Sequence, residues 1–168
     1  MTRSARIAAA CFATVPVAIL GASLLVTFAI AHGAPSGLRT VFRLLCHGIA
    51  TRCIVLWGVP MPICARCTAI YVGLLAGVAL LAPLLPLLTE RASKLILFIA
   101  IIPLAIDGLT QATGLRESTN ALRGVTGFLA GAAFGWWAVT SIERSARALA
   151  DSHTTPESNS NHAENTAS

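Results

Sequence analysis

Residues 7–31 read IAAACFATVPVAILGASLLVTFAIA and hold no charged side chain over 25 consecutive positions. As a helix rising about 1.5 Å per residue, this stretch is about 37 Å long, more than the roughly 30 Å hydrocarbon core of a bilayer. A cleaved secretory signal is the competing interpretation, because Arg3 and Arg6 precede the stretch and residues 29–31 (AIA) resemble a cleavage site. A signal core is shorter, about 7 to 15 residues, so a first membrane span is favoured.

The whole chain has the composition of a membrane protein. Of its 168 residues, 55% are apolar and 11% are charged, and the mean hydropathy is +0.75. A soluble domain has about 25% charged residues. The net charge of +5 does not indicate a nucleic-acid partner, because the arginines flank apolar runs, where membrane lipids and loop orientation explain them.

Three further apolar stretches complete the predicted set of spans. They cover residues 68–88, 93–109 and 120–142 and join the first span in a single helical domain over residues 1–150. Residues 151–168 have too little apolar surface to fold, so a disordered polar tail is predicted.

The connection between the first two spans contains two distinct segments. Residues 38–50 place apolar side chains at i, i+3, i+4, i+7 and i+11, which predicts an amphipathic helix lying on the bilayer surface. Residues 57–62 (WGVPMP) contain two prolines and a glycine, so a turn is predicted there. The predicted fold class is all-α, a polytopic membrane protein with four transmembrane helices plus one interfacial amphipathic helix.

Glycines recur every four residues on two of the predicted spans. Gly73 and Gly77 share one face of the second span, and Gly127, Gly131 and Gly135 share one face of the fourth. Such faces let helix backbones approach closely. Tight packing inside the bundle is the interpretation adopted, and an oligomer formed through the glycine-rich faces is a further expectation.

Four spans would gather the unusual side chains on one side of the membrane. By parity, the connections at residues 32–67 and 108–119 share a side, and both termini lie on the other. The 12 basic residues divide equally between the two sides, so the positive-inside rule gives no orientation.

Four of the five cysteines lie in the first of these connections. Cys64 and Cys67 form a C-x₂-C pair, and Cys46 with His47 would complete a four-ligand site for zinc or another soft metal. Pairing Cys64 with Cys67 and Cys46 with Cys53 would instead give two redox couples, as a quinone-linked thiol-disulfide oxidoreductase requires. Two inert structural disulfides are a third interpretation.

A second polar cluster surrounds the connection between the third and fourth spans. Asp107 lies near the end of the third span, where a carboxylate calls for a partner. Arginines beside the first amides of the next helix suit an anion, although a salt-bridged girdle is the alternative. The candidate catalytic residues are Asp107, Gln111 and Glu117, and the candidate anion-binding residues are Arg116, Ser118, Asn120 and Arg123.

At these residues the chain resembles a family of predicted bacterial membrane proteins defined by domain of unknown function 2085. The shared elements are Cys46–His47, the run CARCTAIY at residues 64–71, and DGLTQ at residues 107–111 followed by Arg116, Ser118, Asn120 and Arg123. The chain departs from the family pattern at Gly48 and Ala69, where that pattern has glutamine and glycine. The resemblance implies an integral protein of the bacterial inner membrane and supplies no activity.

The second half of the chain is also similar to VanZ-like membrane proteins. The function expected first is a Cys/His cluster that binds a soft metal beside an anion-binding site of Asp, Gln, Arg and Asn side chains. The alternatives are the quinone-linked oxidoreductase and an enzyme acting on a lipid or anionic head group, with Asp107 as its base. Membrane lipids and a small anion or head group are the expected partners.

Overall fold

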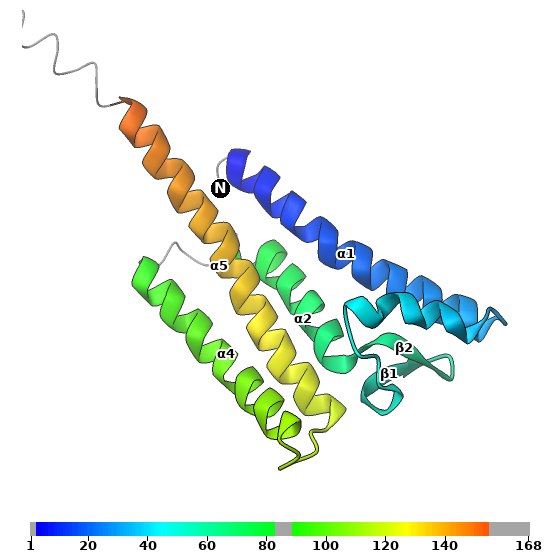
Figure 1. The fold of residues 1–168 in the computed structure, drawn as a ribbon. Helices are drawn as coiled ribbons and strands as arrows, with labels where there is room; N and C mark the ends of the chain where they lie inside the picture. The colour runs from blue at the N-terminus through cyan, green and yellow to red at the C-terminus, as the bar shows by residue number, and fades with distance from the viewer. Residues whose placement is uncertain (1–2, 83–88, 155–168) are drawn as a thin grey trace, which may run out of the picture.

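The computed structural model describes residues 3–82 and 89–154 of the chain. Figure 1 shows α2 and α5 side by side in the middle of a helical bundle, with α1 on one flank and α4 on the other. The helices are α1 (Arg3–Ala31), α2 (Ala65–Ala76) with its π-helical continuation η3 (Gly77–Leu81), α4 (Glu90–Ala112) and α5 (Asn120–Thr154). The connection that follows α1 and the one that joins α4 to α5 lie at the same end of the bundle.

Three of these helices are long and apolar enough to cross a membrane: Ala9–Ala31 of α1, all of α4, and Asn120–Ser152 of α5. Their outer surfaces are apolar; Phe98 of α4, for example, is 65% exposed, as a lipid-facing side chain would be. The apolar helix Ala65–Leu81 is shorter, and residues 83–88 of the predicted second span lie outside the described residues. The structure therefore gives three candidate spans where the sequence predicts four.

A small β-hairpin departs from the predicted all-α fold. Strands β1 (Cys53–Leu56) and β2 (Val59–Cys64) pair antiparallel around a two-residue loop. In that loop Trp57 has a φ of 52° and Gly58 a φ of 77°, the left-handed conformations that a tight hairpin turn needs. The prolines of β2 exclude a helix but are tolerated in a strand at a sheet edge. The predicted turn is present, and the strands on either side of it are the correction.

The predicted amphipathic helix over residues 38–50 is shorter and more tightly wound than expected. The structure has a 3₁₀ helix, η1 (Ser36–Leu44), followed after a gap by the single turn η2 (Ala50–Arg52). On η1, Phe42 is buried while Leu44 is 95% exposed, so apolar groups face both the protein and its surroundings. Gly48 interrupts the helix, because its φ is +58° and a Cβ there would meet the Pro62 carbonyl oxygen at 3.0 Å.

The two glycine-rich faces pack against each other within the chain. A Cβ added at Gly73 would lie 2.2 Å from the Phe128 carbonyl oxygen, and one added at Gly131 would lie 2.2 Å from that of Ile70. Both distances are far below contact, so the backbones of α2 and α5 touch directly at these positions. The faces expected to support an oligomer are thus used inside the bundle.

Helix α5 is longer than the predicted span over residues 120–142. It continues to Thr154 and so includes the first residues of the predicted disordered tail. Good helix formers follow residue 142, and Arg147 donates to the Glu143 carboxylate at 2.7 Å, an i,i+4 pair that supports the extension. The rest of the tail, residues 155–168, lies outside the described residues.

Candidate functional site

A cavity of about 350 Å³ is lined by residues next to the hairpin and by residues on either side of the α4–α5 connection. Its wall is built from the segment after η1, the start of α2, the end of α4 and the start of α5. The side chains that give it chemical character are Cys46, Cys64, Cys67, Arg66, Gln111 and Arg123. Residues from both predicted clusters therefore line one cavity.

Three sulfurs form the first part of the site. The Sγ atoms of Cys46, Cys64 and Cys67 all lie within 4.8 Å of one another. Cys64 ends β2 and caps α2, and its Sγ accepts from the Cys67 backbone N–H at 3.5 Å. The Cys64 N–H in turn donates to Cys46 Sγ at 3.3 Å. The hairpin and the helix start thus hold the three sulfurs together through backbone donors.

The surroundings favour a thiolate at Cys64 and a protonated thiol at Cys67, because the hydrogen bond between the two side chains lowers the pKa of Cys64 and raises the pKa of Cys67. A hydrogen bond from the Cys67 side chain lowers the pKa of Cys64 to about 5, with the Cys67 backbone N–H acting in the same direction and burial opposing both. Cys53 does not belong to the close group of sulfurs. Burial raises the pKa of its thiol to about 11, and its Sγ donates to the Ile49 carbonyl at 3.1 Å. Cys53 is a buried thiol beside the cluster and not one of its members.

The sulfur geometry fits a single soft metal ion. Two thiolates on one tetrahedral zinc ion, with bonds of about 2.3 Å, lie about 3.8 Å apart. A small inward movement of the three sulfurs from their present separation would reach that spacing. His47, the predicted fourth ligand, lines the cavity, but its ring atoms do not belong to the close group and its side chain is exposed. Of the two neighbouring residues before Gly48, Cys46 is buried and His47 is exposed.

One of the two predicted redox couples, Cys64 with Cys67, lies together in the structure, but Cys46 joins this group without Cys53. Cys46 lies with Cys64 and Cys67, whereas the redox interpretation pairs it with Cys53. All five cysteines, including Cys11 on α1, are free thiols in the structure.

Arg66 is a residue of the site for which the sequence indicates an effect on the neighbouring thiols but not a partner. It lies between the two cysteines of the C-x₂-C pair and forms an ion pair with Asp107, whose side chain is 5% exposed. This arginine is the partner that a carboxylate near the end of a span requires. The sequence does show a charged residue, Arg66, at the start of the apolar helix α2. Only the tertiary structure shows that α2 and α4 meet there. The carboxylate proposed as a catalytic base is thus paired with a guanidinium.

Arg123 is the most deeply buried arginine of the site, at 5% exposure. Its Nη1 donates to Asn120 Oδ1 at 2.8 Å. The Gln111 amide is oriented by its hydrogen bonds. Its oxygen accepts from Arg123 Nη2 and from the Ser118 backbone N–H, which is 3.2 Å away. Asn120 also donates to the Thr51 carbonyl at 3.4 Å, which ties the start of α5 to the segment before the hairpin.

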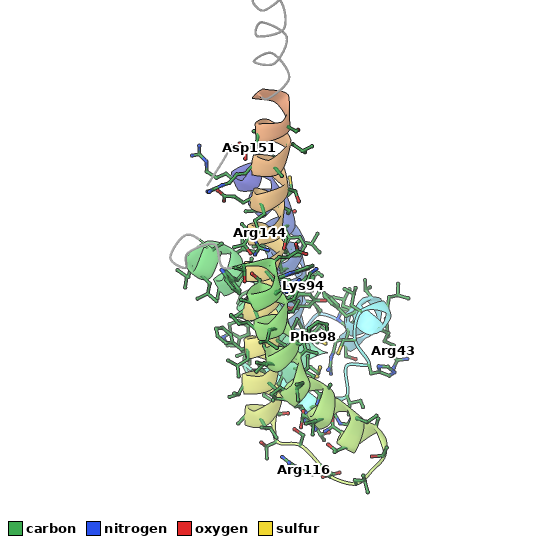
Figure 2. The ribbon with its side chains drawn as sticks, turned by 90° about the vertical axis from the view of Figure 1, so that its left-hand side faces the viewer. Arg43, Lys94, Phe98, Arg116, Arg144 and Asp151 are labelled. Carbon is green, nitrogen blue, oxygen red and sulfur yellow. The ribbon has the colours of Figure 1, made fainter. Side chains whose placement is uncertain are left out.

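The remaining candidates lie outside the cavity wall. Arg116 and Glu117 are exposed on the connection between α4 and α5, and Figure 2 shows Arg116 at the extreme end of the molecule. Ser118 is buried and its hydroxyl donates to the Thr119 carbonyl at 3.4 Å. Arg52, which belongs to the sequence pattern shared with the family but not to the predicted site residues, lines the cavity together with Arg66 and Arg123.

Two archaeal proteins are similar to this chain. The chain is 45% identical over 96 residues to an uncharacterized protein of Methanocaldococcus jannaschii, a match that covers 56% of this chain and 61% of that protein. It is 42% identical over 90 residues to an uncharacterized protein of Methanothermobacter thermautotrophicus, covering 54% of this chain and 80% of that one. The chain thus spans less than two thirds of the M. jannaschii protein.

These relatives are archaeal, so the bacterial setting implied by the resemblance is not what the matches show. No solved structure matches the chain. Residues 46–137, more than half of the chain, match the family described as "Predicted membrane protein (DUF2085)". That matched region contains all three clustered cysteines and every polar residue of the cavity wall. The chain belongs to this family of predicted membrane proteins.

Proposed function

We propose that this protein is a four-span integral protein of the plasma membrane that binds a soft metal ion, zinc in the first instance, at one membrane face. The observation that carries the proposal is the group of three sulfurs, Cys46, Cys64 and Cys67, within 4.8 Å of one another. Thiolate ligands select zinc and other soft ions over magnesium or calcium. The metal would lie beside an anion-binding site of Arg, Gln and Asn side chains.

Two features of the local structure support a metal over a chance meeting of thiols. Backbone N–H groups point at two of the three sulfurs, at 3.3 Å and 3.5 Å, and such donors stabilise metal-bound thiolates. Cys46 and Cys64 are also held by separate elements, the segment after η1 and the end of β2. A metal ion would cross-link those elements to the start of α2 and stabilise this end of the protein.

Metal analysis of the purified protein tests the proposal. The protein in detergent, without chelators, should carry about one equivalent of zinc, and Cys64→Ser should lower this at least about tenfold. Cys53→Ser is the matched control, because Cys53 lies between Cys46 and Cys64 in the sequence but outside the group of three sulfurs. An apo wild-type protein after growth in zinc-replete medium, or an equal loss in Cys53→Ser, would overturn the three-sulfur site.

Thiol counting separates metal binding from disulfide chemistry. In the folded, metal-bound protein the three clustered cysteines should resist a thiol reagent until a chelator is added, and all five cysteines should react after denaturation without any reductant. Disulfides would behave differently, since the count would rise with a reductant and not with a chelator. That second result would favour the thiol oxidoreductase over the metal site.

A further inference from the structure

We infer that the cavity holds a small monovalent anion as the fourth ligand of the metal, and that Arg123 positions it. The inference rests on the metal site proposed above and names what completes that site. No bond in the anion breaks: it replaces a water molecule on the metal and leaves unchanged when water returns.

The ligand count leaves one position open. Among the described residues, the close group of metal-binding atoms contains three sulfurs, and no histidine or acidic side chain supplies a fourth ligand. Zinc with three protein ligands keeps a fourth position for water or another external ligand, whereas a closed structural site has four protein ligands. The cavity is where an external ligand can enter, because all three cysteines line it.

The charges around the cavity favour an anion in that position. Three thiolates and one divalent ion together carry a single negative charge. Arg52, Arg66 and Arg123 line the same cavity, and the Asp107 carboxylate neutralises one of them. The metal-loaded cavity therefore keeps one positive charge, which a monoanion would cancel.

Arg123 is the residue with the strongest demand for such a ligand. It is 5% exposed, and within the described part of the chain its hydrogen-bonding partners are the neutral amides of Asn120 and Gln111. Charged neighbours of both signs surround it, Arg52 and Arg66 as well as Asp107, but a buried guanidinium whose hydrogen bonds all go to neutral groups gains from a directly bound negative charge. Arg66 differs, since its charge is already shared with Asp107.

The volume is sufficient for the proposed ligand. A cavity of about 350 Å³ accepts a halide, an azide ion, a carboxylate or the phosphodiester of a lipid head group. These ions share one chemistry, a single negative charge beside a soft metal. They differ in source, which is either the aqueous phase or the membrane.

Cobalt substitution provides the test. Cobalt(II) takes thiolate sites like those of zinc, and its sulfur-to-metal charge-transfer bands report the sulfurs while its visible bands report the fourth ligand. Azide added to the cobalt protein in neutral phosphatidylcholine nanodiscs should shift the visible bands and leave the charge-transfer bands in place. Nanodiscs containing phosphatidylglycerol, without azide, should produce the shift only if a lipid head group is the natural source.

Arg123→Gln is the decisive variant. It should keep the charge-transfer bands, which shows that the sulfurs still bind cobalt, but should need at least about tenfold more azide for the visible shift. Arg123→Lys should recover part of the response because it restores the charge. Arg116→Gln is the matched control, an exposed arginine of the α4–α5 connection outside the cavity wall, and should respond as the wild type does.

The outcomes keep the two proposals apart. Absence of charge-transfer bands in the wild-type protein would remove the metal site itself. Normal charge-transfer bands with no visible shift in either azide or anionic nanodiscs would overturn the anion inference alone. An unchanged azide midpoint in Arg123→Gln would also overturn it, because the anion would then be bound without that arginine.

Discussion

Helix α5 packs against its two neighbours in opposite ways. On the α2 side, glycines bring the backbones into direct contact, and a Cβ at Gly135 would lie 2.4 Å from the Leu74 carbonyl oxygen. On the other side, α4 has only two buried residues along its described length, Ser93 near its start and Asp107 near its end. One interface is continuous and apolar, and the other depends on polar groups at its two ends.

The difference indicates which part of the site is rigid. The α2–α5 pair carries Cys64, Cys67, Arg66 and Arg123, so most of the chemistry lies on two helices that cannot shift independently. Helix α4 contributes Gln111 to the wall, and Asp107 ties it to Arg66. We therefore expect α2 and α5 to set the geometry of the site and α4 to act as a wall that is held in place by polar contacts.

Substitution of a contact glycine should have the largest effect on this comparison. Gly131→Leu would force a side chain into the space of the Ile70 carbonyl oxygen, 2.2 Å from the new Cβ. Because the nearest atoms belong to the backbone of Ile70 and Leu74, the helices must separate, at a cost of about 3 kcal/mol or more. Loss of monodisperse protein on size exclusion in detergent, or a large drop in the thermal midpoint, is the expected result.

Gly124 provides the control for that substitution. It is in the same helix, but a Cβ there would meet no atom within 4 Å. Gly124→Leu should therefore give protein with a thermal midpoint close to that of the wild type. Equal damage from both leucines would show that the α2–α5 contact is not the rigid part of the molecule.

Removing the charge of Asp107 should have the next largest effect. Asp107→Asn leaves Arg66 without its carboxylate, and breaking one side of a buried pair costs about 3 to 5 kcal/mol. We expect the lower end, because the Arg66 side chain is 21% exposed and partly screened. Thermal unfolding in detergent should show a clear decrease, and the double variant Arg66→Gln/Asp107→Asn should recover part of it. A double variant as unstable as the sum of both single changes would argue that the pair does not join α2 to α4.

The opposite end of α4 should tolerate substitution better. Ser93 is fully buried, and its hydroxyl accepts from Arg144 Nη2 at 2.6 Å and donates to the Thr89 carbonyl at 3.1 Å. Arg144 also donates to Thr140 Oγ1 at 3.3 Å, so it keeps a partner when the serine is lost. Ser93→Ala should cost about 1.5 kcal/mol, the usual loss for one hydrogen bond to a charged group. The same thermal assay should rank it below Asp107→Asn; the reverse order would mean that α4 is anchored chiefly away from the site.

The sequence predicts the apolar helices better than it predicts the polar contacts of the site. Long uncharged runs predict α1, α4 and α5 because a helix that faces lipid must be apolar over its whole length. The C-x₂-C pair likewise predicts two neighbouring sulfurs, and Cys46 joins them in the structure. The hairpin was missed because β1 and β2 are short and the prolines of β2 obscure any alternation. The Arg66–Asp107 pair was missed because its members are 41 residues apart and only the packed helices bring them together.

The smallest effect is expected at His47, where sequence and structure disagree about the metal site. The sequence predicts His47 as a ligand, whereas in the structure its imidazole is exposed and lies outside the close sulfur group. His47→Ala should therefore leave the zinc content within about twofold of wild type, against the tenfold loss expected for Cys64→Ser. Metal analysis of the two variants prepared in parallel makes the comparison. A tenfold loss in His47→Ala would mean that the segment after η1 rearranges on metal binding to bring in the imidazole, and the fourth position would then be closed to an anion.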